Sequence, residues 1–168
     1  MELLVLDLQP DVERLLKEGF FGYLGTSGMD NVPHVTPVIY VYDDKRIFFS
    51  TSKQARKLRN IRENSKVSFV VHASDPSDFF NDEAAIVFGR IKVYDLSSSV
   101  LGSGRLLKVL GLFPRKYPEY ARVYGGDFLK IPKAWRPTLF LSRLIIEISI
   151  MKAIFLRRTQ ISRVSKLI

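Results

Sequence analysis

The residues most suited to chemistry in this sequence are the cations that follow an apolar run in the stretch "FFSTSKQARKLRNIREN", residues 48–64. Arg56 and Lys57 are the central basic pair of this stretch. The apolar run before them ends in three consecutive hydroxyl side chains, Ser50, Thr51 and Ser52. An arginine fork, a lysine point charge and neighbouring hydroxyls are groups that bind phosphate in proteins. The residue types therefore indicate a site for one phosphate group.

The spacing after Ser52 predicts a helix over about 53–64, with Ser52 as its N-cap. Three apolar residues recur at intervals of three and give this helix a narrow buried stripe: Ala55, Leu58 and Ile61. The start of a helix offers free backbone N–H groups and the positive end of the helix dipole, both of which favour a phosphate. Asn60 is three or four residues from each cation and can share their side.

A second interpretation of the same stretch is an exposed amphipathic helix with a solvated basic face, to which Arg59 and Arg62 belong. The turn before the helix contains no glycine, so it is neither a Walker A loop nor a Rossmann fingerprint. Spacing alone supports the phosphate site and the solvated face equally, and both remain open at this point.

Composition limits the other possibilities. The chain has 168 residues, 46% of them hydrophobic, and a net charge of +9, which favours anionic partners. It has no cysteine and only two histidines, so we expect no disulfide, no thiolate chemistry and no metal site. The N-terminus does not resemble a signal peptide, and charged residues interrupt the apolar window 138–156. We therefore expect a soluble cytoplasmic protein without a membrane span.

The elements that must position the basic stretch are mostly strands. A first helix is expected from Pro10 to Gly19, with an apolar stripe of Val12, Leu15 and Leu16. Strands are expected over 20–27, 32–42, 47–51, 66–73 and 84–94, and a last one around 146–150, where isoleucines alternate with Glu147, Ser149 and Met151. Close strands with few helices predict a mainly β fold, a closed or nearly closed antiparallel barrel with peripheral helices.

No boundary divides the chain, so we expect one domain over residues 1–168. Residues 96–137 interrupt the strand pattern with glycine, proline and helix-forming pieces. We interpret them as a helical and irregular insertion, with helices near 99–111 and 117–123.

The order of these segments resembles the pyridoxamine 5′-phosphate oxidase-related, FMN-binding split β-barrel family. The similarity covers roughly residues 10–95. It consists of a short helix, a strand ending in "GTSG", the strand "PHVTPVIYVY", a hairpin, "IFFSTSKQARKLRNIRENSKVSFVV" and a strand with "VFGRIKVY". Each piece is weak alone, and the specificity lies in the ordered set.

This resemblance implies a six-stranded antiparallel split barrel that forms a homodimer, with FMN at the subunit interface. Arg56 and Lys57 match the family's phosphate-binding basic pair, and Ser50 and Thr51 match the strand-end residues near the phosphate and ribityl chain. The family also implies that the backbone of one strand lies along the isoalloxazine edge; that strand matches Thr36, Pro37 and Val38. Asn60 matches a position that is often polar in the family.

The resemblance further implies an oxidoreductase that acts on a small organic substrate. The flavin supplies the redox chemistry, so no catalytic acid–base pair is identified in the chain. The C-terminus "FLRRTQISRVSKLI" contains no histidine, although the authentic oxidase uses an Arg-x-His element there for its substrate. This departure argues against oxidation of vitamin B6.

Three alternatives remain. A deazaflavin coenzyme could replace FMN in the same barrel, because relatives use it and its longer anionic tail would suit the surplus of cations. The chain could also be a non-enzymatic flavin-binding module. A nucleic-acid-binding β-barrel would combine the basic residues with Phe48, Phe49 and Phe69 as stacking platforms, although strand alternation buries at least part of these rings.

Overall fold

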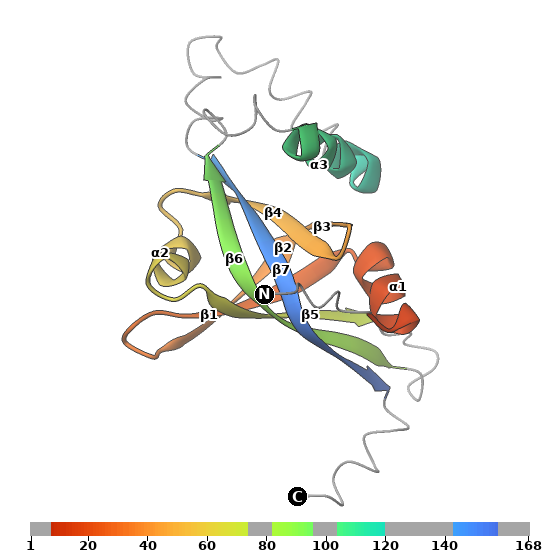
Figure 1. Ribbon diagram of the computed structural model, residues 1–168, viewed down its shortest axis with the longest axis horizontal. Helices are drawn as coiled ribbons and strands as arrows, with labels where there is room; N and C mark the ends of the chain where they lie inside the picture. Colours follow the sequence, from red (N-terminus) through yellow and green to blue (C-terminus); the bar gives the residue numbers. More distant parts are fainter. Residues whose placement is uncertain (1–7, 74–81, 96–103, 120–142, 158–168) are drawn as a thin grey trace, which may run out of the picture.

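The computed structural model describes residues 8–73, 82–95, 104–119 and 143–157 of the chain (Figure 1). These residues form seven strands and three helices. The strands are β1 (Phe21–Ser27), β2 (Pro33–Ile39), β3 (Val41–Asp43), β4 (Arg46–Ser52), β5 (Lys66–Ala73), β6 (Glu83–Asp95) and β7 (Arg143–Arg157).

All strand pairs are antiparallel, and the sheet order is β2-β1-β5-β6-β7-β4-β3. The sheet curls until β2 contacts β4 without pairing to it, which closes a barrel that stays split along one line (Figure 1). The predicted mainly β split barrel is therefore confirmed. It has seven strands instead of six.

The additional strand arises because Tyr40 interrupts the expected strand 32–42 and separates β2 from β3. The Tyr40 N–H donates a hydrogen bond of 3.0 Å to the hydroxyl of Tyr117, and that hydroxyl lies 2.6 Å from the Tyr40 carbonyl oxygen. The backbone of Tyr40 therefore bonds to a side chain instead of a neighbouring strand. Tyr40 and Tyr117 are 77 positions apart, so the sequence around Tyr40 does not indicate this break in the strand.

Two short helices close the barrel core. Helix α1 (Pro10–Glu18) has proline in its first turn and ends before Gly19, as predicted. The buried residues of α1 and of α2 (Arg56–Glu63) pack in one core cluster with the inward side chains of the strands. The helix residues in this cluster include Val12, Leu15 and Leu16 from α1, and Leu58 and Ile61 from α2. Figure 1 shows α1 and α2 at opposite ends of the barrel. Burial of this core is the main stabilising contribution to the fold.

Helix α3 (Gly104–Lys116) covers a second, smaller core on the outside of the barrel. Leu106 and Val109 of α3 pack there against Phe48 of β4 and Ile145 of β7. The predicted helix near 99–111 is thus found several residues later, and the one near 117–123 lies mostly outside the described residues. No helix of the described residues is long and apolar enough to cross a membrane.

The second core changes the expected pattern of β7. Strand alternation predicts Glu147 on a polar face, but only 2% of this residue is exposed. Its carboxylate accepts hydrogen bonds from Arg46 at 3.0 Å and from the hydroxyl of Tyr94 at 2.8 Å. Both faces of the first half of β7 are therefore covered, and the buried carboxylate is compensated by its partners.

Candidate phosphate and flavin site

The basic pair lies in the first turn of α2, but the helix begins later than the sequence predicts. Its first residue is Arg56 and its N-cap is Ala55, whereas we expected Ser52 as the cap. Ser52 instead belongs to the preceding turn, where its carbonyl accepts the Ala55 N–H at 3.2 Å and its hydroxyl accepts the Gln54 N–H at 3.3 Å. These local bonds satisfy the turn and delay the helix by one turn.

The first-turn backbone of α2 provides donors. The N–H groups of Leu58 and Arg59 bond back to Ala55, while no described residue accepts a hydrogen bond from the N–H of Arg56 or Lys57. Free N–H groups are expected at the start of a helix and carry the positive end of its dipole. The Arg56 side chain is exposed, and that of Lys57 is half-buried.

The three hydroxyl residues at the end of β4 are divided between two faces of the strand. Thr51 pairs with the core residue Leu144 and is only 2% exposed. Ser50 and Ser52 belong to the opposite face because successive side chains of a strand alternate. The predicted cluster of three hydroxyls is therefore a pair, Ser50 and Ser52, with Thr51 separated from it.

A residue that the sequence did not indicate joins this pair. Arg143, the first residue of β7, lies opposite Ser52, and its Nε donates a hydrogen bond of 2.9 Å to Ser50 Oγ. Arg143 is also close enough to Lys57 to lower the pKa of that amine, in addition to the larger lowering caused by burial. Arg143 and Ser50 are 93 positions apart, so only the strand register reveals their contact.

Asn60 does not share the side of the two cations. It is 4% exposed, and its Nδ2 donates a hydrogen bond of 3.2 Å to Thr26 Oγ1 of β1. The prediction that Asn60 faces the phosphate was based on helical spacing and on a position that is often polar in the family. Neither distinguishes a residue at the edge of the cationic face from one that packs against the core. Asn60 fastens α2 to the barrel.

The predicted flavin-edge residues lie on β2, the strand at one end of the sheet order. Thr36 is half-buried, Pro37 is exposed and Val38 is 7% exposed. The hydroxyl of Thr36 lies 3.2 Å from Nδ1 of His34. Since β2 pairs only with β1, its other backbone edge faces the split of the barrel, where β4 contacts it.

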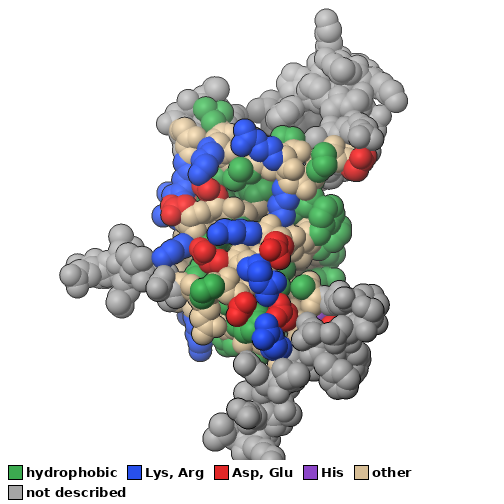
Figure 2. Space-filling model, turned by 90° about the vertical axis from the view of Figure 1, so that its right-hand side faces the viewer, with side chains coloured by type: hydrophobic (Ala, Val, Ile, Leu, Met, Phe, Trp, Pro, Cys, Tyr) green, Lys and Arg blue, Asp and Glu red, His purple; other side chains and the backbone are tan. Residues whose placement is uncertain are grey.

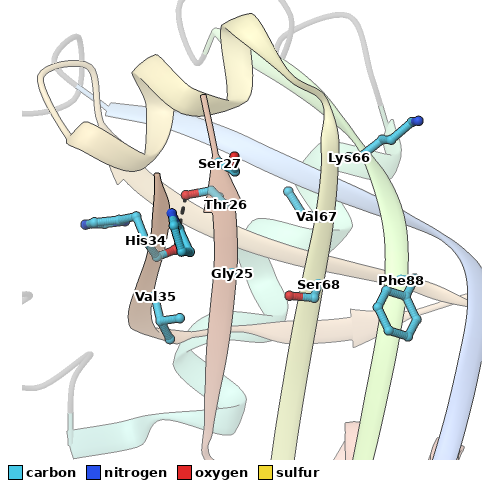
Figure 3. A pocket seen from close by; sticks show the side chains of 10 residues that line it. Gly25, Thr26, Ser27, His34, Val35, Lys66, Val67, Ser68 and Phe88 are labelled. Carbon is cyan, nitrogen blue, oxygen red and sulfur yellow. Dashed lines mark hydrogen bonds between the residues drawn. The ribbon is translucent and has the colours of Figure 1, made fainter. Parts of the chain in front are cut away.

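An open groove of about 340 Å³ crosses the outer face of β1, β2, β5 and β6 (Figure 3). Val35, Gly25, Ser68 and Phe88 form one row across the four strands, with each residue paired to the next. A Cβ atom at position 25 would lie 2.3 Å from Ser68 Oγ. Glycine therefore leaves the floor of the groove free of a side chain at this position. Val35 and Phe88 form its apolar walls, 66% and 42% exposed.

The aromatic platforms expected of a nucleic-acid-binding barrel are buried in the structure. Phe48, Phe49 and Phe69 are each 0% exposed and cannot stack on bases. Figure 2 shows one face on which basic side chains are interspersed with acidic ones. Described ion pairs include Lys17 with Glu13 and Lys108 with Asp43. The structure thus removes the stacking platforms that motivated this alternative, while the net charge of +9 remains.

Comparison with known proteins identifies relatives of the whole barrel. The family model described as pyridoxamine 5′-phosphate oxidase matches residues 8–107. No curated protein matches the chain. The matched segment contains α1, the strands β1 to β6, α2 and the start of α3.

Solved structures share the fold at low sequence identity. An F420 reductase is 20% identical with a TM-score of 0.59, and the match covers 88% of this chain and 98% of that one. A FAD-binding protein from Mesorhizobium loti is 18% identical with a TM-score of 0.62, covering 88% and 94%. A heme storage protein from Vibrio cholerae is 14% identical with a TM-score of 0.62, covering 90% and 95%. Identities this low establish the common fold alone.

Proposed function

Because the chain belongs to the pyridoxamine 5′-phosphate oxidase family, we propose that it binds FMN and acts as a flavin-dependent oxidoreductase on a small organic substrate. The observation that carries the proposal is the half-buried Lys57 in the first turn of α2, which lies within electrostatic reach of Arg143 and has no carboxylate partner among the described residues. An anion would stabilise the charged form of a half-buried amine that lies near a second cation, and the phosphate of a flavin nucleotide can supply that charge.

The residues of the α2 start fit a terminal phosphate. Arg56 and Lys57 supply positive charge, their backbone N–H groups supply donors, and Ser50 and Ser52 add hydroxyls at the end of β4. Together these groups can neutralise a dianion and bond its oxygens. Thr51, buried on the other face, takes no part as a side chain.

The free edge of β2 fits the flavin ring system. Because β2 pairs with β1 on one side, backbone groups of alternate residues in the segment Thr36, Pro37 and Val38 face the free edge, where they can bond the polar edge of a heterocycle, except at the N–H that Pro37 lacks. When bound, the flavin supplies the redox chemistry, and the chain binds and orients it. No catalytic side chain is assigned.

The substrate does not follow from the family. No histidine follows His72 in the sequence to match the Arg-x-His element of the authentic oxidase, so we propose a small redox substrate other than a vitamin B6 phosphate. We also propose that the protein acts in the cytoplasm, as the absence of cysteine suggests.

The active form that we propose is a homodimer with the flavin at the subunit interface. The outer face of the sheet supports this assembly, since Phe21, Tyr23, Val35 and Phe88 expose between 42% and 66% of their surface there. Large exposed apolar clusters usually mark interaction surfaces. A second copy of the chain is the partner that the family implies.

A second candidate is a deazaflavin-dependent reductase in the same barrel, and the similarity in fold to an F420 reductase favours it. Such a coenzyme would use the same cations for its anionic tail. A third candidate, a flavin-binding module without turnover, is favoured by the similarity to a FAD-binding protein.

The visible spectrum of the purified protein, followed by titration with FMN and with a deazaflavin coenzyme, tests the proposal. We expect an FMN spectrum, or saturable uptake of one FMN per chain. Preferential uptake of the deazaflavin would support the second candidate. Bound FMN that neither NADH nor NADPH can reduce would support the module, and a colourless protein that binds neither compound would contradict all three.

A further inference from the structure

Arg143 is fixed at the edge of the proposed phosphate site by the strand register. It begins β7 directly opposite Ser52, the last residue of β4, and its Nε donates to Ser50 Oγ at 2.9 Å. Arginine carries five N–H donors. One hydrogen bond through Nε therefore orients the guanidinium and leaves the donors of its two terminal nitrogens available.

Arg143 differs from nearby cations because it has no acidic partner among the described residues. Cations near either end of β4 have acidic partners: Arg46 pairs with Glu147 at 3.0 Å, and Lys53, which follows the strand, pairs with Asp95 at 3.0 Å. Among the described residues, no carboxylate pairs with Arg143 or Lys57, although Arg143 is near enough to act on the amine of Lys57. Like charges within electrostatic reach of each other repel, which costs free energy in the ligand-free fold.

An anion between the two cations removes this cost. It would accept charge-assisted hydrogen bonds from the guanidinium and the amine, and these are stronger than bonds between neutral groups. The cations come from β7 and α2, elements far apart in the sequence, so the pair exists only in the folded barrel. Neither cation has a role in the hydrophobic core clusters.

We propose that Arg143 is a ligand-binding residue that, together with Lys57, holds a terminal phosphate monoester from the β7 side, with Ser50 as the residue that positions its guanidinium. The inference rests on the proposed flavin nucleotide function and adds to it a residue from outside the resemblance of residues 10–95. Its ligand class is a phosphate monoester such as FMN. Inorganic phosphate is not an ester, but it carries the same anionic oxygens and can therefore compete for the site.

The test compares FMN with riboflavin, which lacks the phosphate, in wild type, Arg143→Met and Arg143→Lys. We expect Arg143→Met to weaken FMN binding about tenfold or more, since bonds to charged groups contribute about 1.5–3 kcal/mol. Riboflavin affinity should stay within about twofold, and Arg143→Lys should restore part of the FMN affinity because it keeps the charge. Inorganic phosphate should compete with FMN in wild type and less well in Arg143→Met.

Arg62→Met is the matched control, because Arg62 is an exposed cation in the last turn of the same helix α2. It should change FMN affinity by less than about twofold. Ser50→Ala should weaken FMN binding less than Arg143→Met does. Circular dichroism of every variant verifies the fold.

The outcomes separate the two proposals. Wild type that binds neither FMN nor riboflavin overturns the proposed function and the inference with it. Tight FMN binding by wild type with unchanged affinity in Arg143→Met overturns the inference alone. An equal loss of FMN and riboflavin affinity also overturns it, because a phosphate ligand should affect only the phosphorylated compound.

Discussion

Asn60 Nδ2 donates a hydrogen bond of 3.2 Å to Thr26 Oγ1, and that hydroxyl in turn lies 3.4 Å from the carbonyl oxygen of His34. The three residues belong to α2, β1 and β2. This chain of polar contacts therefore joins the helix that carries the basic pair to the strand proposed for the flavin edge.

The Asn60–Thr26 bond predicts a measurable loss of stability. Asn60→Ala leaves the buried hydroxyl of Thr26 without its donor and should lower the free energy of unfolding by about 1–3 kcal/mol. Thr26→Val should cost a similar amount, and the double variant should cost less than the sum of the two. Urea unfolding monitored by circular dichroism measures these values. Arg59→Ala, on the exposed side of α2, is the control and should change stability by less than about 0.5 kcal/mol.

Lys57 predicts a trade-off between stability and binding. Burial and Arg143 both lower the pKa of its amine, so the charged form is disfavoured in the ligand-free fold. Lys57→Met should therefore raise the melting temperature of the ligand-free protein while weakening FMN binding about tenfold. Differential scanning fluorimetry with and without FMN measures both effects. A variant that loses stability and keeps its FMN affinity would show that Lys57 is a structural residue.

Lys116 predicts a pH dependence of stability. Its Nζ is buried without a hydrogen-bond partner among the described residues, 4.0 Å from the centre of the Tyr40 ring, and burial lowers its pKa from 10.5 to about 8. Between about pH 8 and pH 10.5, Lys116 therefore binds more protons in the unfolded chain than in the folded protein. The free energy of unfolding should rise as the pH increases from about 8.

We expect Lys116→Met to be more stable than wild type near pH 7 and to lose about 1 kcal/mol of that advantage by about pH 9.5, after allowance for solvent screening. The upper limit stays below the ionisation of Tyr40 and Tyr42, whose pKa values are raised. Chemical unfolding of both proteins at each pH provides the comparison. A constant difference would mean that Lys116 does not titrate in this range.

The apolar sheet face predicts a dimer. Val35→Lys places a charge at an outer position that is 66% exposed, so it should disrupt an assembly without disturbing the monomer. Light scattering coupled to gel filtration should give twice the chain mass for wild type and the single chain mass for the variant. Leu107→Lys, at an exposed position of α3, is the control and should remain dimeric. A monomeric wild type would contradict the interface proposal.

The sequence predicted those features that local periodicity determines. The apolar stripe of α1 and the strands β1, β4, β5 and β6 follow from residue patterns within a few positions. The break at Tyr40 and the burial of Glu147 were not predictable, because each depends on partners far away in the sequence, Tyr117 and Arg46. Residue patterns report which face is apolar but not which other element will cover the opposite face.

The same distinction applies to the candidate site. Arg56 and Lys57 were predicted from residue type and order, and the structure assigns them to the first turn of α2. Thr51 and Asn60 proved to be buried, because strand alternation and helix packing turn them inward. Arg143 was missed since its contact with Ser50 depends on the register of β4 and β7.

The measurement that tests the central claim most directly is the equilibrium affinity for FMN of wild type and of the double variant Arg56→Ala, Lys57→Ala. We predict saturable binding of one FMN per chain by wild type and a loss of about a hundredfold in the double variant, with riboflavin affinity little changed. Equal FMN affinity in the two proteins would contradict a phosphate site at the start of α2, and the absence of FMN binding in wild type would contradict the proposed function itself.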